Sequence, residues 1–153
     1  MEQRADTDLY MEKARLLLQA GERVPLPVQG NSMAPFLVSG RDQVWLEQPQ
    51  TPLRTGDILL YRRSSGQYIL HRVCRTGGTG LTMIGDAHSI REPGVRPEQV
   101  LGRAVCVRRK GKLLKPGNLL WEFFARVWIR MIPVRRPVLR AVTGILKLTG
   151  RKQ

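Results

Sequence analysis

The feature that most limits what this chain can fold into is a series of short apolar segments between residues 23 and 109, punctuated by Gly and Pro. Segments of this length and spacing are typical of β-strands joined by tight turns. The sequence predicts strands near residues 23–29, 42–47, 57–63, 67–75, 80–85 and 100–109. Several short strands at regular spacing favour a mainly β fold, a small barrel or sandwich. Residues 86–99 contain two prolines and show no periodicity, so they are expected to form a loop.

Helical periodicity flanks this β region on both sides. Apolar residues recur at helical spacing over 7–20, and Gly21 supplies a stop. Near the C-terminus the helical period returns, is interrupted by Pro133 and Pro137, and resumes as an amphipathic stretch over 138–148. The sequence therefore predicts an N-terminal helix over 1–22, a β domain over 23–116 and a basic helical tail over 117–153.

Positive charge is concentrated in the tail. The net charge is +14, yet residues 1–102 carry 12 Lys/Arg against 11 Asp/Glu, and the remaining residues carry 14 Lys/Arg against one acid. A basic, amphipathic tail favours a helix pair lying on an anionic membrane surface through 117–150. The aromatic side chains expected to anchor it are Trp121, Phe124 and Trp128.

Two other interpretations of the tail stay open. Its apolar face could pack on the β domain or on a second copy of the chain. The tail could also bind nucleic acid, which ranks last because no recognised binding motif accompanies the charge. A membrane partner protein is a further expectation, since no window reaches the roughly 18 apolar residues of a membrane span.

The N-terminal segment has mixed charge and lacks the basic start and apolar core of a secretory signal, which favours a cytoplasmic protein that binds the membrane peripherally. In that compartment cysteines stay reduced, so Cys74 and Cys106 are interpreted as small buried apolar residues. No metal or cofactor is expected. A site from His71, Cys74, Asp86 and His88 is disfavoured, because residues three apart on a strand face opposite ways.

A Gly-Asn-Ser-Met-Ala-Pro turn at residues 30–35 raises the question of a nucleophile. A serine hydroxyl needs a base within hydrogen-bond reach, and no lysine occurs between Lys13 and Lys110. The remaining bases are His71, predicted on an apolar strand face, and His88, predicted at the surface. Taken alone, a histidine on an apolar face fits a core residue as well as a base.

Five motifs in order carry a resemblance to a known family: "GNSMAPFLVSGRDQV", "GDILLYR", "YILHRV", "MIGDA" and "VLGRAV". This order resembles the signal peptidase I-like serine peptidases, and the His-Arg-Val strand resembles their Ser-His branch rather than the branch with a catalytic lysine. The resemblance spans roughly residues 24–107. It implies a small coiled β-barrel of the signal peptidase type, with the catalytic dyad in a groove at its edge.

The resemblance assigns residues to roles. Ser32 matches the nucleophile, His71 the general base, and Asp86 the acid of the Gly-Asp box. Met33 and Pro35 fall beside the substrate groove, although Met33 could instead pack beneath the turn. Glu92 stands in about the place of a second acid of the family.

The function that follows is a serine endopeptidase that cleaves a leader-like peptide or protein precursor at the membrane surface. Two alternatives stay open. The same barrel could bind peptides without cutting them, or the β domain could be a scaffold for a tail that binds membrane or nucleic acid.

Overall fold

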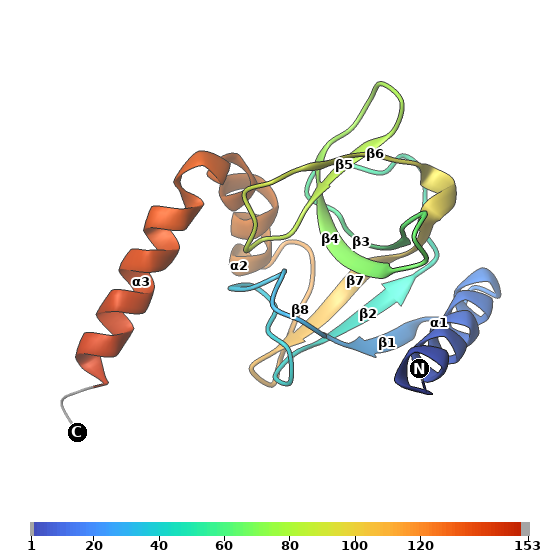
Figure 1. Cartoon of the computed structure of the whole chain (residues 1–153), viewed down its shortest axis with the longest axis horizontal. Coiled ribbons are helices and arrows are strands. Elements are labelled where there is room, and N and C mark those ends of the chain that lie inside the picture. The colour runs from blue at the N-terminus through green and yellow to red at the C-terminus, as the bar shows by residue number, and fades with distance from the viewer. Residues whose placement is uncertain (1, 151–153) are drawn as a thin grey trace.

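The computed structural model describes residues 2–150 and contains one eight-stranded antiparallel sheet with helices at both ends of the chain (Figure 1). The strands are β1 (Val24–Pro27), β2 (Gln43–Glu47), β3 (Ile58–Arg62), β4 (Tyr68–Arg75), β5 (Leu81–Ile84), β6 (Glu92–Val95), β7 (Val100–Arg109) and β8 (Lys112–Leu114). Their order is β1-β2-β7-β3-β4-β5-β6, and β8 pairs with β7. The predicted mainly β fold with terminal helices is confirmed.

The sheet is not closed into a barrel, which corrects the barrel expectation. The terminal strands of the order, β1 and β6, do not pair with each other among residues 2–150. Pro25 and Pro27 leave β1 without two N–H donors, a composition suited to an edge strand. Moreover, β5 pairs with β4 only from Arg72 onward, so residues 68–71 pair with β3 alone. Within residues 2–150, the edge of β4 away from β3 therefore has no strand partner over residues 68–71.

Six strands lie where the sequence predicts them, but two short ones were missed. β6 lies inside the segment expected to be a loop, and β8 follows the turn at Lys110 and Gly111. β6 contains Pro93 and Gly94, which local propensity counts against a strand, and it forms because β5 offers a free edge. The N-terminal helix α1 (Glu2–Gln19) lies within the predicted range 1–22 and begins five residues before the helical periodicity at 7–20.

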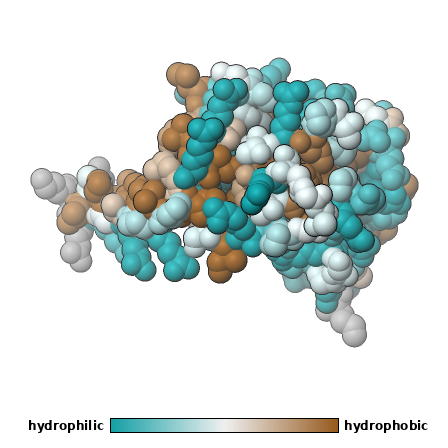
Figure 2. Space-filling model, turned by 90° about the horizontal axis from the view of Figure 1, so that it is seen from above, coloured by the Kyte–Doolittle hydropathy of each residue, from teal (hydrophilic) through white to brown (hydrophobic). Residues whose placement is uncertain are grey.

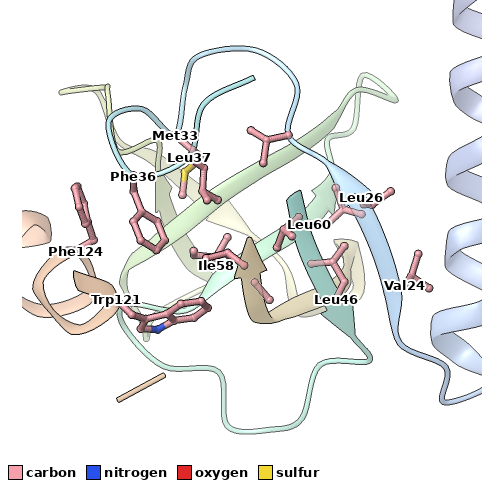
Figure 3. Packing of buried hydrophobic residues seen from close by; sticks show 14 of the residues in the cluster. Val24, Leu26, Met33, Phe36, Leu37, Leu46, Ile58, Leu60, Trp121 and Phe124 are labelled. Carbon is pink, nitrogen blue, oxygen red and sulfur yellow. The ribbon is translucent and has the colours of Figure 1, made fainter. Parts of the chain in front are cut away.

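Strand β3 separates two apolar clusters. Its residues 58–61 are all buried: Ile58 and Leu60 face the larger cluster, and Leu59 and Tyr61 face the smaller one. Figure 3 shows the larger cluster, in which side chains from β1 and β2 meet residues of the Ser32 turn and of the C-terminal segment. The smaller cluster also contains Val73 and residues of β5 and β6.

Several side chains of the first part of the tail pack on the β domain. This part consists of α2 (Leu119–Glu122), one π-helical turn over Phe123–Val127, and two 3-10 turns over Trp128–Arg130 and Ile132–Val134. The proposed anchors Trp121, Phe124 and Trp128 are all buried, and the Phe124 ring lies 4.9 Å from the Phe36 ring between centroids. Their assignment as membrane anchors is wrong, because the β domain offers them an apolar face to cover.

Helix α3 (Arg135–Thr149) behaves differently from the segment before it. Pro137 does not break it, because it lies in the first turn, where a backbone N–H has no helical partner. Beyond its first turns α3 extends away from the sheet (Figure 1), and Val142, Ile145 and Leu146 are exposed. Within residues 2–150, no helix is both long and apolar enough to span a bilayer.

Candidate functional site

Ser32 lies on a compact turn between β1 and β2. The backbone N–H of Ala34 donates to the carbonyl of Asn31 at 3.2 Å, and that of Leu37 donates to Met33 at 2.9 Å. Gly30 has φ of +71°, a conformation that a side chain rarely adopts. Met33 and Leu37 are buried beneath the turn, whereas Ser32 is half-buried at its surface. The apolar residues thus fix the turn and leave the serine facing outward.

His71 on β4 shares a groove with Ser32. The groove has a volume of about 370 Å³, and its two walls are the Val28–Met33 segment after β1 and residues 67–71 at the start of β4. His88 also lines it, and the His71 and His88 rings lie 5.4 Å apart between centroids. His71 is only 5% exposed. The structure therefore brings the predicted nucleophile and the predicted base to one groove.

The loop after β5 packs closely against both residues. A methyl group at Gly85 would lie 2.5 Å from the Ser32 carbonyl oxygen and 3.1 Å from Nε2 of His71, so only glycine fits there. The same methyl group would lie 2.9 Å from Nδ1 of His88. The backbone N–H of Ala87 donates to the Ser32 carbonyl at 2.9 Å. Nε2 of His71 thus faces the backbone of Gly85, which lies against the Ser32 carbonyl, and within residues 2–150 no hydrogen bond joins the Ser32 hydroxyl to His71.

The other nitrogen of His71 faces a tyrosine and an acid. The hydroxyl of Tyr61 lies 3.5 Å from Nδ1 of His71 and donates a hydrogen bond to Glu92. The Tyr61 hydroxyl donates its one proton to Glu92, so the tautomer of His71 that suits this contact carries its proton on Nδ1. That tautomer leaves a free lone pair on Nε2, as a general base for Ser32 needs.

The ionisation of these groups is consistent with this arrangement. Burial, reinforced by the charge of His88, lowers the pKa of His71 to about 4, so the ring is neutral at pH 7. Burial raises the pKa of Tyr61, and its hydrogen bond to Glu92 raises it further. Burial opposes the charge on Glu92, but hydrogen bonds from Arg63 and Tyr61 outweigh it and lower its pKa.

Asp86 is bound to a different partner than expected. Both of its carboxylate oxygens accept hydrogen bonds from Arg72, at 2.9 and 2.8 Å, and neither side chain is exposed. Across residues 2–150, no hydrogen bond joins Asp86 to His71. Arg72 follows His71 on β4 and faces the opposite side of the sheet, so its partner Asp86 points away from the histidine. The acid of the Gly-Asp box thus holds the loop, and Glu92 takes the place near the imidazole.

The two residues expected beside the substrate have different surroundings. Met33 is 2% exposed and lies beneath the turn, and it also contributes to the floor of the groove. Pro35 does not line the groove, and its carbonyl accepts a hydrogen bond from Arg109 on β7. Cys106 is buried and Cys74 half-buried, and both are free thiols. No cluster of metal-ligating side chains occurs within residues 2–150.

No family model matches this chain, and no curated protein matches it. The assignment of the site therefore depends on its motifs and on its geometry.

The sequence alone does not identify Arg72, which binds Asp86, or Tyr61, which contacts His71. Arg72 lies inside the predicted strand over 67–75, and an arginine within a buried strand indicates a buried acid partner. Tyr61 pairs with Ile69 across β3 and β4, two positions from the Leu59–His71 pair, so strand register would have placed it diagonally next to His71.

A second, more apolar pocket adjoins the groove. It has a volume of about 390 Å³ and lies between α1 and the sheet, with Tyr10 and Met11 on the helix side. Four residues line both spaces: Val28, Gln29, Tyr68 and Leu70. The groove thus continues from Ser32 into an apolar hollow along the start of β4.

Proposed function

We propose that this chain is a serine endopeptidase of the signal peptidase type, with Ser32 as nucleophile and His71 as general base. The observation that carries the proposal is the shared groove: Ser32 and His71 both line it, and Nδ1 of His71 lies 3.5 Å from the Tyr61 hydroxyl, which binds Glu92. The order of the five sequence motifs supports the same assignment.

The chemistry follows from this orientation. Nε2 of His71 takes the proton of the Ser32 hydroxyl as its oxygen attacks a peptide carbonyl, and the protonated ring then donates to the leaving amine. The resulting ester on Ser32 is hydrolysed by water activated in the same way. Tyr61 and Glu92 keep the proton of the neutral ring on Nδ1 and favour the charged ring that forms during the reaction. The Ser32 N–H is a donor available to the oxyanion.

The substrate that fits the groove is an extended peptide. Residues 68–71 of β4 have backbone N–H and C=O groups on the groove side that no strand takes within residues 2–150. A peptide can pair with such an edge, and alternate side chains then enter pockets in the floor. The hollow beneath Tyr10 and Met11 would take an apolar side chain of that peptide.

The membrane part of the proposal rests on α3. Its exposed apolar residues lie opposite a face that carries Arg136, Arg140 and Lys147, which suits an anionic lipid surface. Figure 2 shows hydrophobic and hydrophilic surfaces side by side along this helix. Each basic residue near such a surface contributes on the order of 1 kcal/mol. The substrate would then be a leader-like precursor met at the membrane, with or without a membrane partner protein.

A peptide-binding module without catalysis is the second candidate. The position of Asp86, which binds Arg72 and leaves His71 without a direct carboxylate partner, favours it. In that case the groove would bind extended peptides equally well with and without the Ser32 hydroxyl.

A mixture of synthetic random-sequence peptides tests the two candidates. The purified chain is incubated with the mixture, and mass spectrometry reads the products. We expect a subset of peptides to be cut by the wild type and none by Ser32→Ala, with Ser39→Ala, an exposed serine on the following turn, as the matched control. Equal cleavage by Ser32→Ala would refute the serine mechanism. Peptide retention without cleavage by both proteins would establish the binding module.

A further inference from the structure

The C-terminal segment binds the loop after β5, which packs against both the Ser32 turn and His71. Three carbonyls of this loop accept hydrogen bonds from two residues far along the chain, Trp128 and Arg135. We propose that Trp128 and Arg135 are positioning residues of the Ser32–His71 site, so that the tail is part of the catalytic apparatus. This inference rests on the function proposed above.

The contacts reach three of the first four carbonyls of the loop. The indole N–H of Trp128 donates to the carbonyl of Asp86 at 2.8 Å. Nη1 of Arg135 donates to the carbonyls of Gly85 and His88, at 3.1 and 2.9 Å. These bonds are buried or partly buried, where a lost partner costs more than it does in water.

The opposite side of the same loop touches the site. The Ala87 N–H donates to the Ser32 carbonyl, and a methyl group added at Gly85 would lie within 3.1 Å of both that carbonyl oxygen and Nε2 of His71. A shift of the loop would therefore move the serine turn and the imidazole relative to each other. A misplacement of about 1 Å between reacting groups can reduce a rate by about 10²-fold.

Arg135 is buried in a position from which its side chain binds the loop. It is the first residue of α3 and is 0% exposed, whereas its neighbour Arg136 is exposed. Its guanidinium also donates to the Trp128 carbonyl through Nε and Nη2, and it lies 5.4 Å over the Trp128 ring. Arg135 has no salt bridge with a carboxylate within residues 2–150, so its charge is stabilised by carbonyl dipoles and an aromatic face.

The C-terminal segment has a part that contacts the β domain and a part that is exposed to solvent. The Arg135 side chain binds the loop after β5, Val138 and Leu139 pack against the larger apolar cluster, and from Arg140 onward α3 is exposed. A tail that served only to bind a surface would not need to place a fully buried arginine against the loop next to Ser32.

Substitutions of two arginines of the C-terminal segment test the inference on the full chain. Arg135→Gln removes the hydrogen bonds to the loop, Arg135→Lys retains the charge with fewer donors, and Arg130→Gln, at an exposed arginine of the same segment, is the matched control with the same loss of charge. The readouts are the ¹⁵N signals of the His71 and His88 rings, and kcat and KM on the best-cleaved peptide of the random mixture. We expect Arg135→Gln to displace the ring signals and to lower kcat by about 10²-fold with little change in KM, Arg135→Lys to recover part of both, and Arg130→Gln to match the wild type.

Unchanged ring signals and kcat in a folded Arg135→Gln protein would overturn the inference. If the wild type cleaves no peptide, the proposed function fails, but the ring signals still decide whether Arg135 positions the histidines. If Arg135→Gln does not fold, Trp128→Phe keeps an aromatic ring in the core and removes only the donor to Asp86. Ring signals of His71 and His88 that match the wild type in Trp128→Phe would then overturn the inference.

Discussion

The buried histidine makes the stability of this protein depend on pH in a predictable way. Burial, with a smaller contribution from His88, lowers the pKa of His71 to about 4 in the folded chain, against about 6.5 in an unfolded chain. Between these values the unfolded state binds a proton that the folded state does not. The free energy of unfolding therefore falls as the pH is lowered from 6.5 towards 4.

The size of the effect follows from the two pKa values. Each pKa unit corresponds to about 1.4 kcal/mol, so the full difference amounts to about 3 kcal/mol at pH values below 4. Between pH 7 and pH 5 the expected loss is about 2 kcal/mol. Glu92 and Asp42 have lowered pKa values, so their stabilising contributions are lost only below their unfolded values near 4, outside this window.

Urea unfolding at pH 7 and pH 5 measures this difference. We expect the wild type to lose about 2 kcal/mol between the two pH values, and His71→Gln to lose much less. His88→Gln is the control, because it leaves the burial of His71 intact and should retain most of the pH dependence. A wild type and a His71→Gln variant with the same pH dependence would refute the account of a buried neutral imidazole.

Three further predictions concern the site and the tail. Tyr61→Phe removes the link between His71 and Glu92, and we expect kcat to fall by about 10²-fold in peptide cleavage assays while KM stays near the wild-type value. Asp86→Ala leaves Arg72 as an unpaired buried charge, and we expect urea unfolding to show a loss of about 3–5 kcal/mol, partly recovered by Arg72→Met together with Asp86→Leu. Ile145→Asp should weaken co-sedimentation with phosphatidylglycerol vesicles by about 10-fold or more, whereas Thr143→Asp, with the same charge on the polar face of α3, should weaken it less. Equal effects of the two α3 variants would contradict a membrane-facing apolar stripe.

The strands were predictable because their signal is local. β2, β3 and β4 each show the alternation or continuous apolar run that a half-buried or fully buried strand requires. β6 could not be predicted this way, because Pro93 and Gly94 disfavour a strand. The segment forms a strand because it pairs with the free edge of β5. The local sequence limits which secondary structures a segment can form, and the neighbouring strand determines which of them it forms.

The site shows the same limit. Ser32 and His71 could be paired from their motifs, and the structure places both in one groove. The orientation of Asp86 could not be deduced, because it depends on which face of β4 the loop approaches. The position of Tyr61 next to His71 depends on the register between β3 and β4, which the sequence alone does not give.

The tail was misjudged in part for a thermodynamic reason. Its aromatic residues are suited to a lipid surface and to a protein core alike, since both remove apolar area from water. Composition cannot choose between the two, and here the β domain covers Trp121, Phe124 and Trp128. Helix α3 keeps an exposed apolar stripe, and Leu119, Phe123 and Val127 of the preceding segment are exposed as well.

The most direct test of the central claim is a comparison of peptides and new N-termini in cells that produce the wild type, Ser32→Ala or His71→Gln at equal levels. The account predicts a small set of products that the wild type makes and both variants lose, and their ends would give the sequence preference of the groove. Identical profiles from the three folded proteins would contradict a Ser32–His71 peptidase.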